Sequence, residues 1–183
     1  ARALYIGGAF INSAHSMKIA RSIFERHLPE MISDNGYLSE SSSHYQFLLT
    51  KNMQEVSIFA TACEDYGFQE FITTYSESMT EASKRLIPYN LVKKCDIPKI
   101  GDVSPDMPTD WFNLKNFDQH GTWNKLWKKS FESKSMVPKA SHIDGWATSQ
   151  KDDWFLLAHS HPSKDLFPSG HGHRDFGSFV LYD

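Results

Sequence analysis

Three side chains near the end of the sequence could together hold a metal ion. His171, His173 and Asp175 alternate with other residues in the stretch GHGHRDFGSF. If this segment is extended, residues two apart face the same side and the three side chains converge. Imidazole and carboxylate suit Zn²⁺, which takes about four ligands, or three and a water. A solvated glycine-rich turn explains the spacing equally well. His159 and His161 form a second pair, which we interpret as surface residues.

A second group of polar side chains follows an Asn-Gly turn signal in the first third of the chain. The turn delivers Glu40, His44 and Tyr45 to the expected start of a helix. Helix starts leave backbone amides free and favour anionic groups, so this segment could face a ligand. The structural alternative is that Ser42 or Ser43 caps the helix and Tyr45 is a core aromatic. The residues by themselves leave both interpretations open.

The elements that must position these side chains are helices first and strands second. Apolar residues at three- and four-residue spacings predict helices over about residues 13–31, 43–63 and 71–86. We expect Gly67 to end the second of them. The short connections predict that neighbouring helices are antiparallel.

The second half of the chain has a different pattern. Prolines crowd the segment 96–110, which predicts an irregular loop. Alternating apolar residues predict strands at 146–148, 153–159 and 177–182. Helices followed by strands favour an α+β class over an alternating α/β fold. We divide the chain into a helical region (1–113), a connecting segment (114–140) and a strand region (141–183).

Composition excludes some functions and leaves others open. The net charge of −3 argues against broad nucleic-acid binding, which needs a basic surface. The sequence lacks the apolar run of about 18 residues that a membrane span needs. Cys63 and Cys95 are too few for a disulfide framework; they could form one bridge or stay as two buried thiols, and we favour the thiols. The abundant aromatic residues suit a carbohydrate site as well as a core. The oligomeric state stays open.

Read together, three segments resemble the heparinase II/III-like polysaccharide lyases. The family pattern D-G-x-x-x-E-x-S-x-x-Y-H is similar to residues 35–46, and P-x-x-G-D is similar to residues 98–102. The pattern D-W followed by G-H-x-H-x-D-x-x-S-F is similar to residues 153–154 and 170–179. The order and rough spacing of the segments agree across essentially the whole chain.

The resemblance implies an (α/α) toroid of antiparallel helices, followed by an antiparallel β-sandwich, with a substrate cleft between them. It implies β-elimination on an acidic, uronic-acid-containing polysaccharide in the periplasm or outside a bacterial cell. Tyr45 matches the catalytic tyrosine, and His171 would face the cleft as a second catalytic residue. A tyrosine, with a pKa near ~10, needs help to act as the base but none to protonate the leaving oxygen.

The resemblance also assigns binding roles. Glu40, His44 and Asp102 would bind the substrate or orient Tyr45. His173 matches a metal ligand, usually for Zn²⁺, and the metal would organise the strand region rather than transfer protons.

The chain departs from the family pattern at several positions. Gln46 replaces the common histidine after the tyrosine, and Arg174 and Phe176 are unusual within the terminal pattern. The family's Asn-His pair has no counterpart ahead of Tyr45, and its later metal ligands would lie beyond Asp183. We therefore expect a piece of a longer lyase-like protein that is inactive by itself.

Three other interpretations stay open. The chain could be a non-catalytic glycan-binding or assembly protein on a lyase-like scaffold. It could be a metallohydrolase of the metallo-β-lactamase type, whose H-x-H-x-D-H pattern is close, although Phe176 takes the last position. It could also be only a structural piece of a larger protein.

Overall fold

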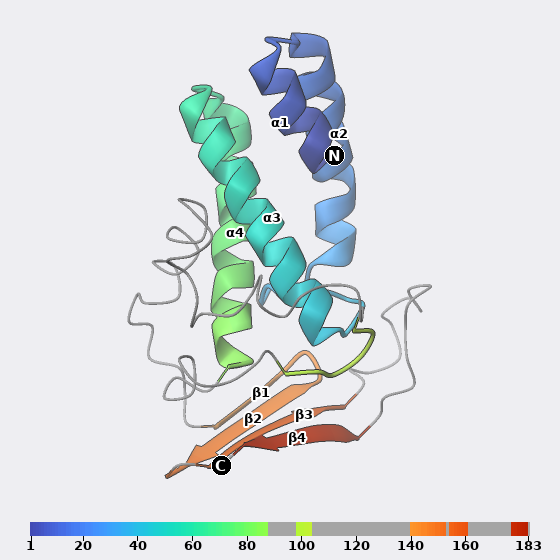
Figure 1. The fold of residues 1–183 in the computed structure, drawn as a ribbon, viewed down its shortest axis with the longest axis vertical. Helices are drawn as coiled ribbons and strands as arrows, with labels where there is room; N and C mark the ends of the chain where they lie inside the picture. The colour runs from blue at the N-terminus through green and yellow to red at the C-terminus, as the bar shows by residue number, and fades with distance from the viewer. Residues whose placement is uncertain (88–97, 104–139, 153, 161–176, 183) are drawn as a thin grey trace.

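The structure, a computed structural model, describes residues 1–87, 98–103, 140–152, 154–160 and 177–182. Within these ranges, four helices precede a four-stranded antiparallel sheet, which confirms the predicted α+β class. The helices run along the length of the molecule, and the sheet lies across their lower end (Figure 1). The (α/α) toroid and the β-sandwich stay predictions.

Two of the helices begin at serine caps. The helices are α1 (Arg2–Phe10), α2 (Ala14–Met31), α3 (Ser43–Ala62) and α4 (Tyr66–Arg85). The last three correspond to the predicted helices, and α1 has no counterpart among them. Ser13 caps α2 by accepting a bond from Ser16 N at 3.3 Å, and Ser42 caps α3 by accepting one from Tyr45 N at 3.2 Å. Each cap satisfies a backbone amide that the helix start leaves unpaired.

Gly67 does not end a helix, and the sequence prediction is wrong at this position. The chain leaves α3 after Ala62 and reverses where Glu64 takes a φ of 55°. Glu64 therefore supplies the left-handed conformation that a terminating glycine usually supplies. Gly67 is the second residue of α4. Cys63 lies in the same reversal, and its thiol is free and exposed rather than buried as expected.

The sheet is a simple meander. Its strands are β1 (Ala140–Ile143), β2 (Trp146–Lys151), β3 (Trp154–His159) and β4 (Ser178–Tyr182), and each pairs antiparallel with the next. Asp144 and Gly145 join β1 to β2 with φ values of 52° and 81°. Two positive φ values characterise the type I′ turn, whose twist matches that of the flanking strands.

Helices and sheet share a buried core. Side chains from the lower ends of α3 and α4, from the segments beside them and from β2 and β3 form one apolar cluster: Tyr37, Phe47, Ala82, Leu86, Ile87, Ile100, Trp146, Phe155 and Leu157. A second cluster lies higher, among the four helices. Because the first cluster draws on both regions, the sheet and the helix ends are packed as one body.

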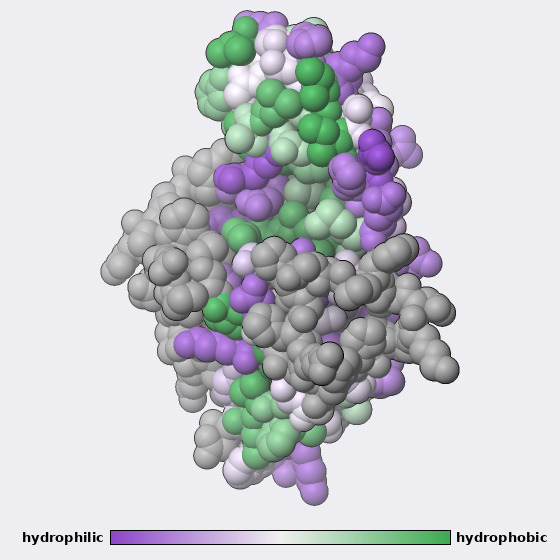
Figure 2. All heavy atoms as spheres, turned by 90° about the vertical axis from the view of Figure 1, so that its right-hand side faces the viewer, coloured by the Kyte–Doolittle hydropathy of each residue, from purple (hydrophilic) through white to green (hydrophobic). Residues whose placement is uncertain are grey.

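Apolar side chains are exposed in two places: on the face of the sheet that points away from the helices, and at the end of the helices away from the sheet. Trp154, Leu156, Phe179 and Leu181 are exposed and alternate with buried or half-buried residues on β3 and β4. Figure 2 shows hydrophobic side chains gathered at the end of the helices away from the sheet. Among the helices in the described part of the chain, none combines the length and apolar content needed to cross a membrane.

Candidate functional site

The turn that leads into α3 is held rigidly against the helices. Gln46, 1% exposed, accepts a hydrogen bond from Leu38 N at 2.7 Å and donates one to Gly36 O at 2.9 Å. Gly36 takes a φ of 83°, and it lies so close to Ser78 of α4 that a Cβ would overlap the Ser78 carbonyl. Gln46, a departure from the family pattern, therefore fixes the segment that carries Glu40.

A second segment docks on the first turn of α3. Ser43 donates through Oγ to Pro98 O, its Oγ accepts from Ile100 N at 3.0 Å, and its backbone N donates to Ile100 O at 2.9 Å. Ser42 Oγ donates to Asp102 O at 2.5 Å, across 60 positions of sequence. The described segment 98–103 is irregular, as predicted, and it is seated on the helix start.

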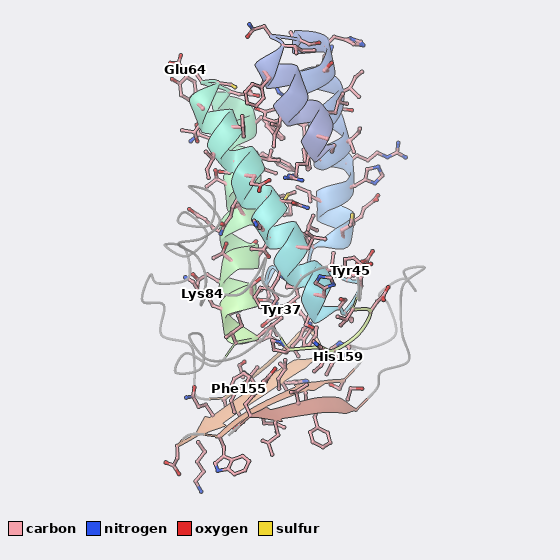
Figure 3. The ribbon with its side chains drawn as sticks, viewed as in Figure 1. Tyr37, Tyr45, Glu64, Lys84, Phe155 and His159 are labelled. Carbon is pink, nitrogen blue, oxygen red and sulfur yellow. The ribbon has the colours of Figure 1, made fainter. Side chains whose placement is uncertain are left out.

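Docking brings Asp102 into electrostatic contact with His44, beside Tyr45. The His44 side chain is buried, and its ring stacks near that of Tyr45 with 5.7 Å between centroids. Burial lowers the pKa of His44, and the negative charge of Asp102 acts in the opposite direction. The neutral imidazole is thus favoured next to a phenol. Figure 3 labels Tyr45 in the first turn of α3, towards the sheet.

The predicted site residues divide into two groups. Tyr45, His44 and Asp102 are brought together at the start of α3, and Glu40 lies half-buried on the connection just before it. His171 and His173 lie outside the described residues. Among the residues that the structure does describe, no cluster of side chains could hold a metal ion, so the Zn²⁺ site stays a prediction.

His159 is buried, which corrects its interpretation as a surface residue. It is 4% exposed, and its ring centroid lies 4.6 Å from that of Trp146. On β3 it continues the buried series of Phe155 and Leu157. Figure 3 labels Phe155 and His159 on this strand. The alternation of the strand therefore decides its environment. His161 lies outside the described residues.

A pocket that was not predicted from the sequence lies beside this site. The pocket, of ≈330 Å³, is lined by residues of the segment 29–41 and by Asp144. Asp144 accepts from Ser33 Oγ at 2.6 Å and from Asn35 Nδ2 at 3.3 Å, and so joins the β1–β2 turn to the α2–α3 connection. These partners are more than 100 positions apart, so no local pattern in the sequence could indicate the pocket.

The pocket lining combines acidic and hydroxyl-bearing residues with apolar ones. Its described lining includes the carboxylates of Glu30, Asp34 and Asp144, serine hydroxyls, the Asn35 amide and the ring of Tyr37. Burial raises the pKa of Tyr37, the charge of Asp144 raises it further, and Arg85 acts against both. The Tyr37 phenol is therefore protonated and is a hydrogen-bond donor at neutral pH.

No family model matches the chain. The comparison with curated proteins finds no match, and neither does the comparison with solved structures.

Proposed function

We propose that the protein is a polysaccharide lyase that cleaves a uronic-acid-containing polysaccharide by β-elimination, with Tyr45 transferring a proton. One observation carries the proposal. The two segments that resemble family motifs, 35–46 and 98–102, meet at the first turn of α3 through the buried hydroxyls of Ser42 and Ser43. A catalytic site requires motif residues that are far apart in sequence to meet, and these meet at the helix start that carries Tyr45.

The proposed reaction needs a base and an acid. The base removes the proton from C5 of the uronate, the C4–O4 bond breaks as the C4–C5 double bond forms, and the acid protonates O4. Tyr45 is suited to the acid role, because a protonated phenol can give its proton to the leaving O4 without prior activation. Burial lowers the pKa of His44 and favours its neutral form, so we assign it the role of orienting Tyr45 or the substrate rather than a share of the proton transfer.

The remaining proposed roles lie around Tyr45. Asp102 and Glu40 would orient the substrate, and His171 would complete the catalytic group from the strand region. His173 would bind Zn²⁺, and no step of the proposed reaction passes through the metal. Because such polysaccharides occur outside cells, the proposal places the protein in the periplasm or outside a bacterial cell.

The test compares Tyr45→Phe with the unaltered protein, using the full polypeptide that the gene encodes. Heparan-like, alginate-like and hyaluronan-like polysaccharides are supplied, and the ultraviolet absorbance of the unsaturated uronate product is followed. We expect Tyr45→Phe to lower the rate by at least ~100-fold, the usual contribution of a general acid or base. Binding, measured by calorimetry, should not change, because only the hydroxyl is lost.

Tyr75→Phe is the matched control, since Tyr75 is a half-buried tyrosine on α4. It should cleave at the unaltered rate. Equal rates for Tyr45→Phe and Tyr75→Phe would refute the catalytic role of Tyr45. Absence of unsaturated product from every polysaccharide would refute the lyase itself.

The pocket beside α3 favours a second candidate function, a non-catalytic glycan-binding or assembly protein. Its volume of ≈330 Å³ is within the range of small-ligand sites, and its carboxylate, amide and hydroxyl groups can bond to sugar hydroxyls. This function predicts glycan binding without unsaturated product. Asn35→Ala should then weaken binding, while Tyr45→Phe and the control Asn52→Ala should leave it unchanged. Unaltered binding by Asn35→Ala would remove the pocket from consideration.

A further inference from the structure

One hydroxyl group joins two parts of the candidate site. Ser42 is 1% exposed, and its Oγ accepts from Tyr45 N at 3.2 Å while donating to Asp102 O at 2.5 Å. A hydroxyl has one hydrogen to donate and lone pairs to accept, so both bonds form at once. Ser42 therefore links the backbone of Tyr45 to the backbone of Asp102, which an ordinary helix cap does not do.

The segment that carries Asp102 is seated directly on this turn. Gly101 takes a φ of 81°, and a Cβ placed there would lie 2.6 Å from Ser41 O and 2.9 Å from Ser42 Cα. Both are backbone atoms, so they cannot rotate away. A side chain at position 101 would have to lift the segment from the helix start, and the position of Asp102 would change with it.

The position of Asp102 matters because its charge reaches His44, whose ring lies beside Tyr45. We propose that Ser42 is a positioning residue for Tyr45, and that it acts by holding Asp102 against the His44–Tyr45 pair. The inference rests on the proposed lyase function and assigns a role to a residue that does not itself transfer a proton. It predicts that removing the Ser42 hydroxyl and lifting the segment 98–103 from the helix start both displace Asp102 and slow the reaction.

The kinetic test is a double-mutant cycle in the full encoded polypeptide. Ser42→Ala and Gly101→Ala should each lower kcat about 10- to 100-fold, because misplaced groups at the site cost rate. The double variant should be no slower than the slower single variant, because both changes break one connection. Ser13→Ala, which removes the cap of α2, should leave kcat unchanged.

A titration that needs no turnover separates this inference from the proposed function. Burial lowers the pKa of His44 and the charge of Asp102 partly offsets this. Where His44 stays buried, displacing Asp102 should therefore make the His44 resonance titrate at lower pH in Ser42→Ala and in Gly101→Ala than in the unaltered protein. Ser13→Ala should titrate as the unaltered protein does. A protein that cleaves no polysaccharide but shows these shifts would lose the proposed function and keep the Ser42–Asp102–His44 connection.

Two results would overturn the inference. Additive losses of kcat in the double variant would show that Ser42 is only a helix cap, and so would an unshifted His44 titration in Ser42→Ala. If circular dichroism shows that Ser42→Ala does not fold, the kcat and the His44 titration of Gly101→Ala are the test of the inference. An unaltered kcat together with an unaltered His44 titration in that variant would refute the positioning role.

Discussion

Gly36 is the position where a single added methyl group should test the packing most sharply. Its φ of 83° lies in the left-handed region, where a side chain costs about 1–2 kcal/mol. The added Cβ would also overlap the carbonyl of Ser78 and lie 2.8 Å from Met79 N. Both atoms belong to the backbone of α4, so the overlap can be relieved only by moving the turn away from the helix.

The magnitude follows from these two costs. Overpacking a tight site adds about 1–3 kcal/mol, and the smaller conformational entropy of alanine in the unfolded chain returns about 0.4–1 kcal/mol. Gly36→Ala should therefore lower the free energy of unfolding by about 1–5 kcal/mol. With a urea dependence of about 2 kcal/mol per molar, the unfolding midpoint should fall by about 0.5–2.5 M.

The matched control is Gly7→Ala. Gly7 lies inside α1, and no atom lies within 4 Å of the position of its added Cβ. Alanine is favoured over glycine inside a helix by about 0.5–1 kcal/mol, so this midpoint should rise. Urea unfolding followed by circular dichroism measures both variants. A Gly36→Ala midpoint at or above that of the unaltered chain would refute the reasoning, because neither the backbone strain nor the overlap could then exist.

Three further predictions concern stability. Leu157→Ala should lower the free energy of unfolding by about 2–5 kcal/mol, because Leu157 is fully buried between sheet and helices. Leu156→Ala, at an exposed position on the same strand, should lower it by less than half as much, and urea unfolding midpoints measure both variants. Tyr5 donates to Asp65 at 2.7 Å, and burial raises its pKa, so folding stability should fall as pH rises above the ordinary tyrosine pKa of ~10. The stability of Tyr5→Phe should fall less steeply over that pH range than that of the unaltered protein. Equal slopes of stability against pH in the two proteins would contradict the prediction. Asp144→Ala should cost about 1–3 kcal/mol in thermal unfolding by leaving the β1–β2 turn unbonded to the α2–α3 connection.

Local patterns were sufficient for most of the secondary structure. Apolar spacing located α2, α3 and α4 within a few residues, because a helix that packs on one side must repeat its buried residues at that period. Ser42 as the cap of α3 could also be predicted, since capping depends on residues a turn apart. The helix α1 was missed, because its two glycines obscure a helical pattern.

Predictions failed at Gly67, where a neighbouring residue decides the outcome, and at His159, where a distant part of the chain does. Gly67 resembles a helix terminator, but Glu64 already completes the reversal between α3 and α4. His159 reads as a surface residue, because the sequence does not show that helix ends cover its side of the sheet. In both cases the residue type permitted two environments, and the surrounding structure selected one.

The candidate site divides in the same way. The resemblance supplied Tyr45, His44, Glu40 and Asp102 as residues of interest, and its pattern includes Ser42, but it did not indicate that the Ser42 hydroxyl joins Tyr45 N to Asp102 O. The pocket wall at Asp144 depends on partners from the other end of the chain.

The sequence by itself determined the α+β class, the existence of three helices and the turn before Tyr45, because propensity, capping and periodicity act over a few neighbouring residues. Only the tertiary structure decided that the segment 98–103 rests on α3, that Asp102 acts on His44 and that the sheet closes the core below the helices. These contacts depend on which surfaces are buried against each other. Burial depends on the whole chain, so no short stretch of sequence contains it.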